Sequence, residues 1–289
     1  MRYDFIEAHR PMWHLRHMCK ALGVSRSGYF SWRNRGPSRR SCEDAELTEL
    51  ISASSQRSRG TYGSPRIHDD LKDKGLKTSR KRVARLMTEA GISSCHRRKK
   101  HIVTTDSNHD QPVNKNILQQ DFSASQANSK WVTDITYIRT NAGWLYLAAV
   151  MDLYSRKIVG WAMREHMTSE LVLRAFDMAI NKRHPKENLI HHSDRGSQYA
   201  SREYRQALEK SQVIQSMSRK GCCYDNAAME SFFHTLKVEC VHRNNFQTRL
   251  EATQAIFEYI ETFYNRTRKH STLGNVSPEQ FERHNKDCA

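Results

Sequence analysis

Apolar residues at helical spacing predict a helical hairpin near the start of the chain. One helix covers residues 13–22 and stops at Gly23, and Ser25 is expected to cap a second helix over 26–35. Glycine commonly ends helices because it adopts a left-handed backbone, and serine accepts a hydrogen bond from a free N–H of the first turn. The pattern therefore predicts an all-α unit over residues 1–40.

A second hairpin follows with clearer signals. Ser64 as N-cap and Pro65 as the first helical residue begin a helix that Gly75 ends, and Thr78 or Ser79 begins the next helix. A short Gly-containing turn followed by a basic helix has the form that fits a DNA major groove. Many αα-hairpins share this form without contacting DNA, so the interpretation depends on the basic residues.

Those basic residues lie on and just after the last of these helices. The candidate DNA contacts are Arg80, Lys81, Arg82 and Arg85 on the helix, and Arg97 and Arg98 beyond it. Residues 1–120 carry 24 basic and 12 acidic side chains, so they hold three quarters of the net charge of +16. Lys and Arg on phosphates release condensed counterions, so double-stranded DNA is the favoured partner. The alternative is a basic surface that only aids solubility.

From residue 131 the pattern changes to apolar, β-branched and aromatic runs. Runs at 131–139, 144–152 and 157–164, separated by turn residues, predict an antiparallel meander. Helices and strands then alternate, with strands at 189–194 and 213–218. This order predicts an α/β fold with a mixed five-stranded sheet and flanking helices, the ribonuclease H-like arrangement.

The patterns divide the chain into four parts. Between residues 93 and 130 the periodicity disappears, which predicts a basic and polar linker. The expected division is a helical hairpin at 1–40, a helix-turn-helix domain at 41–95, a linker at 96–120 and an α/β domain with a C-terminal helix and tail at 121–289.

Composition excludes several classes of protein. The longest apolar run, 145–151, is far shorter than the roughly 20 residues of a membrane-spanning helix, and the start of the chain has no apolar stretch typical of a secretory signal. Seven scattered cysteines without a C-x-x-C pair indicate reduced thiols. We therefore expect a cytoplasmic protein, associated with the nucleoid if it binds DNA, and no membrane partner.

Three acidic residues occur where a core would not ordinarily hold a charge. Asp134 interrupts the first strand, Asp194 ends the fourth, and Glu230 lies one turn into a helix. The predicted topology makes the two strands neighbours, so the three carboxylates would repel one another unless divalent cations neutralised them. Hard ions such as Mg²⁺ or Mn²⁺ prefer oxygen ligands. Taken alone, Asp194 is also explained as a turn cap.

Four motifs carry a resemblance to a known family. W-V-T-D-I-T-Y-I, H-S-D-R-G-S-Q-Y, N-A-A-M-E-S-F-F-H-T-L-K and Y-N-x-x-R-x-H-x-x-L occur in this order, and 35 residues separate Asp194 from Glu230. Over about residues 121–280 the chain resembles the OrfB-type DDE transposases of IS-three family insertion sequences, which are similar to retroviral integrases. The segment Y-G-S-P-R-I, from Tyr62, resembles their upstream helix-turn-helix region.

The resemblance implies a chemistry for these residues. Asp134, Asp194 and Glu230 would be the catalytic residues and would hold two divalent metal ions, Mg²⁺ or Mn²⁺, for DNA strand cleavage and strand transfer. Lys237 would anchor a phosphate, although it could be an ordinary surface lysine. Four residues of the last motif, whose role in structure or DNA contact stays open, are Tyr264, Asn265, Arg266 and His270. We do not regard His191 and His192 as catalytic.

The resemblance also implies partners. These are the element ends and target DNA, further copies of the chain on DNA, and an upstream-frame protein or a frameshift fusion with it. Two alternatives remain: a catalytically inactive DNA-binding regulator of a mobile element, and a metal-dependent nuclease that lacks a joining step.

Overall fold

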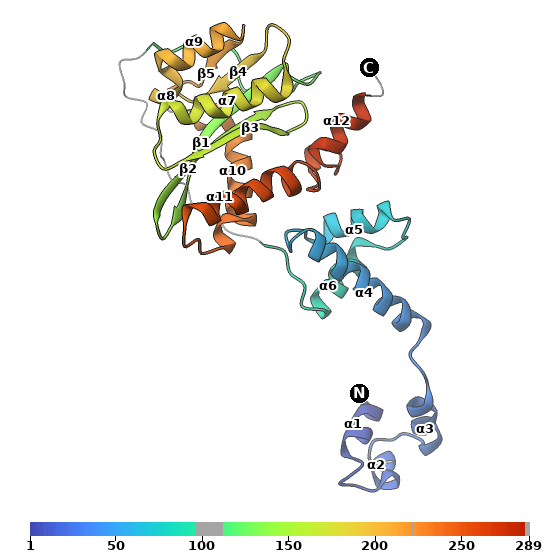
Figure 1. The fold of residues 1–289 in the computed structure, drawn as a ribbon. Coiled ribbons are helices and arrows are strands. Elements are labelled where there is room, and N and C mark those ends of the chain that lie inside the picture. The colour runs from blue at the N-terminus through green and yellow to red at the C-terminus, as the bar shows by residue number, and fades with distance from the viewer. Residues whose placement is uncertain (96–111, 221, 287–289) are drawn as a thin grey trace.

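The computed structural model describes residues 1–95, 112–220 and 222–286 (Figure 1). At the N-terminus three short helices form a bundle that lies apart from the rest of the molecule in Figure 1. They are α1 (Arg2–His9), α2 (Leu15–Ala21) and α3 (Arg26–Asn34). Ser25 accepts a hydrogen bond from the Gly28 N–H at 2.9 Å, which confirms it as the cap of α3. The bundle core is small and consists of Ile6, Met18, Cys19 and Tyr29.

Three further helices form the next unit. They are α4 (Arg39–Arg57), α5 (Ser64–Asp73) and α6 (Arg80–Glu89). The helices predicted for α5 and α6 are confirmed, and α4 was not predicted. Ser64 as N-cap is wrong, because Gly63 is the N-cap and Ser64 is already helical. Pro65 fits either N-cap assignment. The backbone N–H groups of the first helical turn have no acceptor within the helix, so a proline is tolerated at its first or second position.

As predicted, the α/β part contains one five-stranded mixed sheet; its strand order is β3-β2-β1-β4-β5. The strands are β1 (Lys130–Thr140), β2 (Gly143–Asp152), β3 (Ile158–Arg164), β4 (Ile190–Ser193) and β5 (Ile214–Met217). β1, β2 and β3 form the antiparallel meander, while β4 lies parallel to both β1 and β5. The first and fourth strands are thus neighbours, which positions the residues discussed below.

Helices cover both faces of the sheet (Figure 1). One face packs on α7 (Ser169–Arg183), α8 (Ser197–Ala200) and α9 (Arg202–Lys210) around a core that includes Trp131, Phe176 and Leu208. The other packs on α10 (Ala227–Glu239) and α11 (Arg249–Glu258), which continues as a π-helical segment, Tyr259–Tyr264. The chain then reaches α12 (Pro278–Lys286). The remaining short 3-10 helices are Cys223–Asn226, Val241–Arg243 and Ser271–Leu273.

The unit formed by α4, α5 and α6 docks on the C-terminal part of the α/β domain. One buried apolar cluster continues from Ile51 and Ile67 to Ile260 and Tyr264. Across the contact, the Tyr62 hydroxyl accepts a hydrogen bond from the Lys269 backbone N–H at 2.7 Å. The Lys269 ammonium also pairs with two carboxylates of α5, those of Asp70 at 3.1 Å and Asp73 at 2.6 Å.

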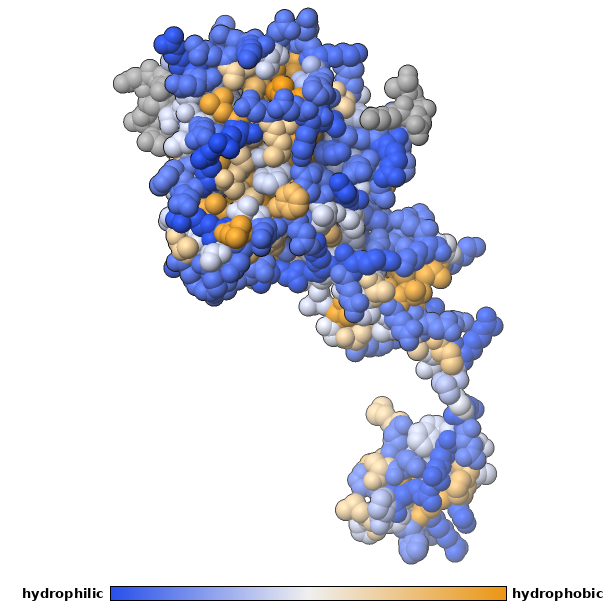
Figure 2. Space-filling view, in the orientation of Figure 1, coloured by the Kyte–Doolittle hydropathy of each residue, from blue (hydrophilic) through white to orange (hydrophobic). Residues whose placement is uncertain are grey.

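The described end of the expected linker joins the core. The Ser216 hydroxyl on β5 accepts hydrogen bonds from the backbone N–H groups of Ile117 and Leu118 at 2.9 and 3.1 Å, and Leu118 is buried. Figure 2 shows a largely hydrophilic surface with scattered apolar positions. Among the described residues, no helix combines the length and apolar character that crossing a bilayer requires.

Candidate active site

Strand register brings the two aspartates together. In the parallel pairing of β1 with β4, Val132 lies opposite His192. Asp134 and Asp194 each follow two residues later. Because side chains alternate with a period of two, both carboxylates reach the same level, where β4 ends beside the middle of β1. Beyond Val132 no further β1–β4 partners pair, so this edge of β1 is open.

The third carboxylate is positioned by the start of α10. The Asn226 side-chain amide donates a hydrogen bond to the Thr133 carbonyl at 3.0 Å, immediately before Asp134 in β1. Glu230 follows Asn226 by four residues, so the two occupy one face of the helix. The exposed Glu230 side chain therefore lies one turn along α10 from its contact with β1.

The three acidic groups act on one another electrostatically. Burial raises the pKa of Asp134 well above its ordinary value of 3.8, and the charges of Asp194 and Glu230 raise that pKa further. The Ile135 N–H opposes these effects by donating to Asp134 Oδ1 at 2.8 Å. A negative charge on Asp134 is thus unfavourable without a cation. Lys237 supplies part of the compensation.

The donor set fits a hard divalent cation. It consists of carboxylate oxygens, which Mg²⁺ and Mn²⁺ prefer. Burial and the neighbouring negative charges raise the pKa of Asp134, and a bound cation would oppose both effects. Within the described ranges, no three His, Cys, Asp or Glu side chains are gathered tightly enough to form a ready-made metal-binding group. Repulsion opposes closer approach of the carboxylates, and a bound cation would offset that repulsion.

Lys237 lies two turns beyond Glu230 on α10. Its ammonium is 4.5 Å from the centre of the Tyr137 ring, a cation–π distance. Burial lowers the pKa of Lys237, while the charge of Asp134 acts in the opposite direction. The side chain is thus held at the edge of the acidic cluster rather than extended into solvent.

Residues around the cluster that the sequence did not single out hold it in place. Asp225 is fully buried and accepts hydrogen bonds from Asn116 Nδ2 at 2.9 Å and from Gln120 Nε2 at 2.7 Å. The Arg219 guanidinium beside it holds its pKa well below the ordinary value. Tyr199 is buried, with its hydroxyl 3.3 Å from Thr133 Oγ1. The sequence signal that could have identified Asn226 is N-x-x-x-E, the spacing that puts it one helical turn before Glu230.

Asp194 also caps the turn that follows it. The Gly196 N–H donates to Asp194 Oδ1 at 3.0 Å, as the alternative explanation for this residue requires. The turn and the acidic cluster are compatible, because a carboxylate has a second oxygen and further lone pairs.

The basic residues of α6 differ in their availability. Arg80 and Lys81 are exposed. Arg82 and Arg85 instead bind the Asp44 carboxylate of α4, each at 2.6 Å, so their charges stabilise the contact between α6 and α4. Arg97 and Arg98 lie outside the described residues.

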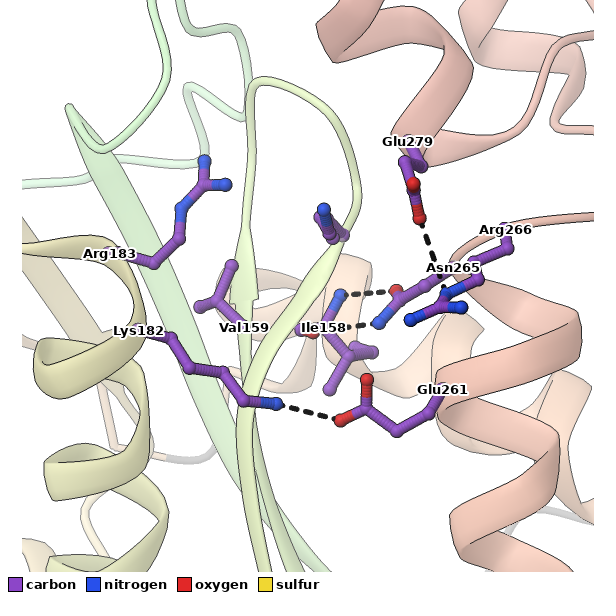
Figure 3. Close-up of a pocket in the computed structure, with 9 residues that line it drawn as sticks. Ile158, Val159, Lys182, Arg183, Glu261, Asn265, Arg266 and Glu279 are labelled. Atoms are coloured by element: carbon purple, nitrogen blue, oxygen red, sulfur yellow. Dashed lines mark hydrogen bonds and ion pairs between the residues drawn. The ribbon is translucent and has the colours of Figure 1, made fainter.

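Most residues of the last sequence motif make contacts within the chain. Asn265 is buried, and its side chain accepts from the Ile158 N–H and donates to the Ile158 carbonyl, both at 2.9 Å, which attaches the C-terminal segment to β3 (Figure 3). Tyr264 is also buried, and its ring meets that of His270 edge-on. Arg266 is exposed and pairs with Glu279 at 3.5 Å beside a cavity of about 340 Å³ (Figure 3).

The histidines of β4 are core residues. Both are buried, and burial lowers the pKa of His191 to about 3 and that of His192 to about 4. His192 lies between two serine hydroxyls, Ser216 at 2.8 Å and Ser218 at 3.1 Å. Burial and hydrogen bonding therefore account for two histidines in this strand without a catalytic role.

The chain matches three known domain families. Residues 124–223 and 230–285 each match an integrase core domain, and residues 42–101 match an HTH-like domain.

Curated relatives match along nearly the whole chain. It is 44% identical over 287 residues to "Transposase InsF for insertion sequence IS3A" of Escherichia coli (strain K12), covering 99% of each chain. It is 48% identical over 264 residues to the "Insertion element IS600 uncharacterized 31 kDa protein" of Shigella sonnei, covering 91% of this chain and 97% of the other.

Solved structures also show similarity. A simian T-cell lymphotropic virus intasome, in complex with a PP2A regulatory subunit, aligns with a TM-score of 0.47 and 14% identity over 82% of this chain and 74% of the other. The HTLV-2 integrase catalytic core domain, in complex with magnesium, aligns with a TM-score of 0.45 and 16% identity over 55% of this chain and 99% of the other.

Proposed function

Because this chain belongs to the InsF-type transposases of IS3-family insertion sequences, with their integrase catalytic core, we propose that Asp134, Asp194 and Glu230 catalyse its cleavage and joining of DNA strands. The observation that carries this assignment is the strand register, which brings Asp134 and Asp194 to one level, with the start of α10 attached to β1 one turn before Glu230. Burial and the charges of Asp194 and Glu230 raise the pKa of Asp134, as is common at catalytic sites, and bound cations would offset this cost.

The carboxylates would bind two divalent cations, Mg²⁺ or Mn²⁺. Such a pair supplies a Lewis acid and lowers the pKa of an attacking water. Asp134 and Asp194 would be held at a fixed level by the strand register, and Glu230 by the anchored start of α10. Preorganised groups of this kind reduce the cost of orienting the reactants.

Two displacements at phosphorus account for the reaction. In the first, a water oxygen forms a bond to phosphorus, the bond to the 3′-oxygen breaks, and that oxygen leaves as a 3′-OH. In the second, this 3′-OH attacks another phosphodiester, and a new 3′-oxygen leaves. The number of phosphodiester bonds is conserved in the second step. Lys237, beside Asp134, would bind a phosphate next to the one that reacts.

DNA binding outside the site would fall to the basic N-terminal part. Arg80 and Lys81 are the accessible candidates on α6, and Arg97 and Arg98 follow in sequence. Arg82 and Arg85 contact DNA only if they exchange their bonds to Asp44 for phosphates. Each phosphate contact would make binding more dependent on salt.

The assembly proposed is a multimer of this chain on paired element ends, with target DNA bound at the same time. An upstream-frame protein, separate or fused, would add recognition of the ends. Since DNA is the substrate, we expect the protein at the nucleoid.

The test is a strand-cleavage and strand-joining assay with element-end DNA and Mg²⁺. Wild-type protein should cut at the 3′ end of the element and join it to target DNA, and Asp194→Asn should lower both rates by at least about 1,000-fold, a loss of roughly 4 kcal/mol. The matched control is Asp177→Asn, an exposed carboxylate on α7 across the sheet, which should leave both rates unchanged.

The same assay distinguishes a transposase from a DNA-binding regulator and from a nuclease. Equal activity of wild type and Asp194→Asn would contradict the assignment, and no activity in either would indicate a DNA-binding regulator. Cutting without joining, and without dependence on the element end, would indicate a nuclease.

A further inference from the structure

The β1–β2 hairpin presents an exposed tryptophan opposite Arg139, five residues along β1 from Asp134. Trp144, at the start of β2, is 47% exposed. Its ring meets that of Tyr137 at 5.2 Å and 88°, an edge-on contact between diagonal neighbours on the same face of the two strands. Single exposed apolar side chains are common on protein surfaces, so exposure alone indicates nothing.

Hydrogen bonds attach the hairpin around Trp144 to neighbouring segments. The Arg249 guanidinium of α11 donates to the Trp144 carbonyl at 3.1 Å. At the turn, the Asn141 N–H donates to the Phe246 carbonyl at 2.9 Å, and the Asn141 side chain donates to Gln247 Oε1 at 2.7 Å. The tryptophan is thus presented from a hairpin attached to α11 and the loop before it. A group held in this way loses little freedom on binding a ligand.

Aromatic and basic groups lead from Trp144 to the site. Tyr137 contacts Trp144 on one side and carries the Lys237 ammonium, 4.5 Å from its ring centre, on the other. Lys237 in turn lies within the electrostatic reach of Asp134. Across the strand pair, exposed Arg139 lies opposite Trp144. A flat aromatic surface flanked by cations matches a nucleobase with its phosphate.

We propose that Trp144 stacks on a nucleobase of the DNA end bound in the active site, while Lys237 binds an adjacent phosphate. This inference rests on the proposed function, and it adds a contact that holds the DNA end relative to the carboxylates. Every base has a π face, so the contact is sequence-tolerant and positions the DNA without reading its sequence.

The test uses element-end DNA that carries 2-aminopurine at one of its terminal positions, one position per duplex, in buffer without divalent cations. Wild-type protein should quench the probe at one position. Trp144→Ala should lose that quenching and bind the end roughly 5- to 100-fold more weakly, as expected for one base–aromatic stack. Trp144→Phe should restore most of both effects.

Phe257→Ala is the matched control. Phe257 is 49% exposed on α11 and also makes an edge-on contact, with Trp161 at 5.9 Å, on β3, which lies two strands from β1. This variant should quench and bind like wild type, and circular dichroism should show that all variants are folded.

The following results would overturn the inference. Quenching and affinity of Trp144→Ala equal to wild type would show that no base stacks there, and loss of self-association by Trp144→Ala without DNA would show that a second copy covers the tryptophan. Wild-type protein that neither binds nor cleaves end DNA would overturn the proposed function, and this inference with it. Cleavage by wild type with an unaffected Trp144→Ala would overturn the inference alone.

Discussion

The charged form of Asp134, which metal binding would require, destabilises the fold in the absence of metal. Its carboxylate lies in a strand where burial and two neighbouring negative charges oppose ionisation. The folded protein therefore binds a proton at Asp134 more tightly than the unfolded chain does. Without metal, the stability contribution of this group is full below its ordinary pKa of 3.8 and is lost as pH rises through the raised pKa.

Replacing Asp134 by asparagine should consequently stabilise the metal-free protein. Thermal unfolding of Asp134→Asn in chelator should show a higher midpoint than wild type at pH 7 to 8, and the difference should shrink towards pH 4 as the wild-type carboxyl becomes protonated. Added Mg²⁺ should stabilise wild type more than the variant.

Asp121→Asn provides a control of opposite sign. The Lys130 ammonium and Ser123 lower the pKa of Asp121 to about 2, so its charge favours the folded state above pH 3.8. The variant should be no more stable than wild type at neutral pH. A midpoint for Asp134→Asn at or below wild type at pH 8 would contradict the electrostatic description of the site.

At this scale the sequence predicted the groups that would perform the chemistry but not those that hold them. Asp134, Asp194 and Glu230 stand out because acidic residues are unusual in such surroundings. Asn226 and Asp225 do not stand out, since amides and carboxylates at a helix start are ordinary capping residues. Their importance depends on contacts with Thr133, Asn116 and Gln120, which are distant in sequence.

Elements were predictable where one periodicity extends over a whole segment. The meander strands and α7 are found where the apolar pattern indicated them, because each buries one regular face. The pattern failed for α1 and α4, because α1 buries only Ile6 and the buried apolar residues of α4, Leu47 and Ile51, lie only in the middle of a long polar helix. The apolar pattern also did not predict the π-helical segment Tyr259–Tyr264, because its wider turns depend on tertiary packing.

A glycine in β3 sets the distance between the sheet and α7. A Cβ on Gly160 would collide with the Ala175 carbonyl, and it would lie 2.7 Å from the Ala179 nitrogen. Helix backbone cannot move aside as a side-chain end can. We expect Gly160→Ala to lower the free energy of unfolding by about 3 kcal/mol, measured by urea denaturation.

Gly36→Ala is the comparison for this change, since a Cβ there meets nothing within 4 Å. It should change the free energy of unfolding by less than about 0.5 kcal/mol. Equal stability of Gly160→Ala and wild type would show that α7 does not pack on β3 at this distance.

At the scale of the whole molecule, the helix-turn-helix-like unit and the catalytic domain share one core. The sequence predicted the two units but not their contact, because ion pairs between residues about 200 positions apart leave no local pattern. Lys269 is only 8% exposed, and it joins α5 to the C-terminal segment through Asp70 and Asp73. DNA bound by one unit would thereby be positioned relative to the other.

Lys269→Ala should loosen this contact. The change leaves Asp70 with the Ser54 hydroxyl and the more distant Arg57 guanidinium and should cost about 2 kcal/mol at the interface. Hydrogen exchange in α5 should therefore accelerate while exchange in α7 stays unchanged. Arg174→Ala removes an exposed pair with Glu170 and should alter neither. Unchanged exchange in α5 of Lys269→Ala would mean that the apolar cluster alone holds the two units together.

The central claim is that Asp134, Asp194 and Glu230 bind shared cations, and the most direct test is anomalous diffraction from crystals of the full chain grown with Mn²⁺. We predict Mn²⁺ peaks within bonding distance of the Asp134 and Asp194 carboxylates, with Glu230 drawn towards them, and loss of the peaks in Asp194→Asn. Peaks elsewhere on the chain, or none near these residues at saturating Mn²⁺, would contradict the claim.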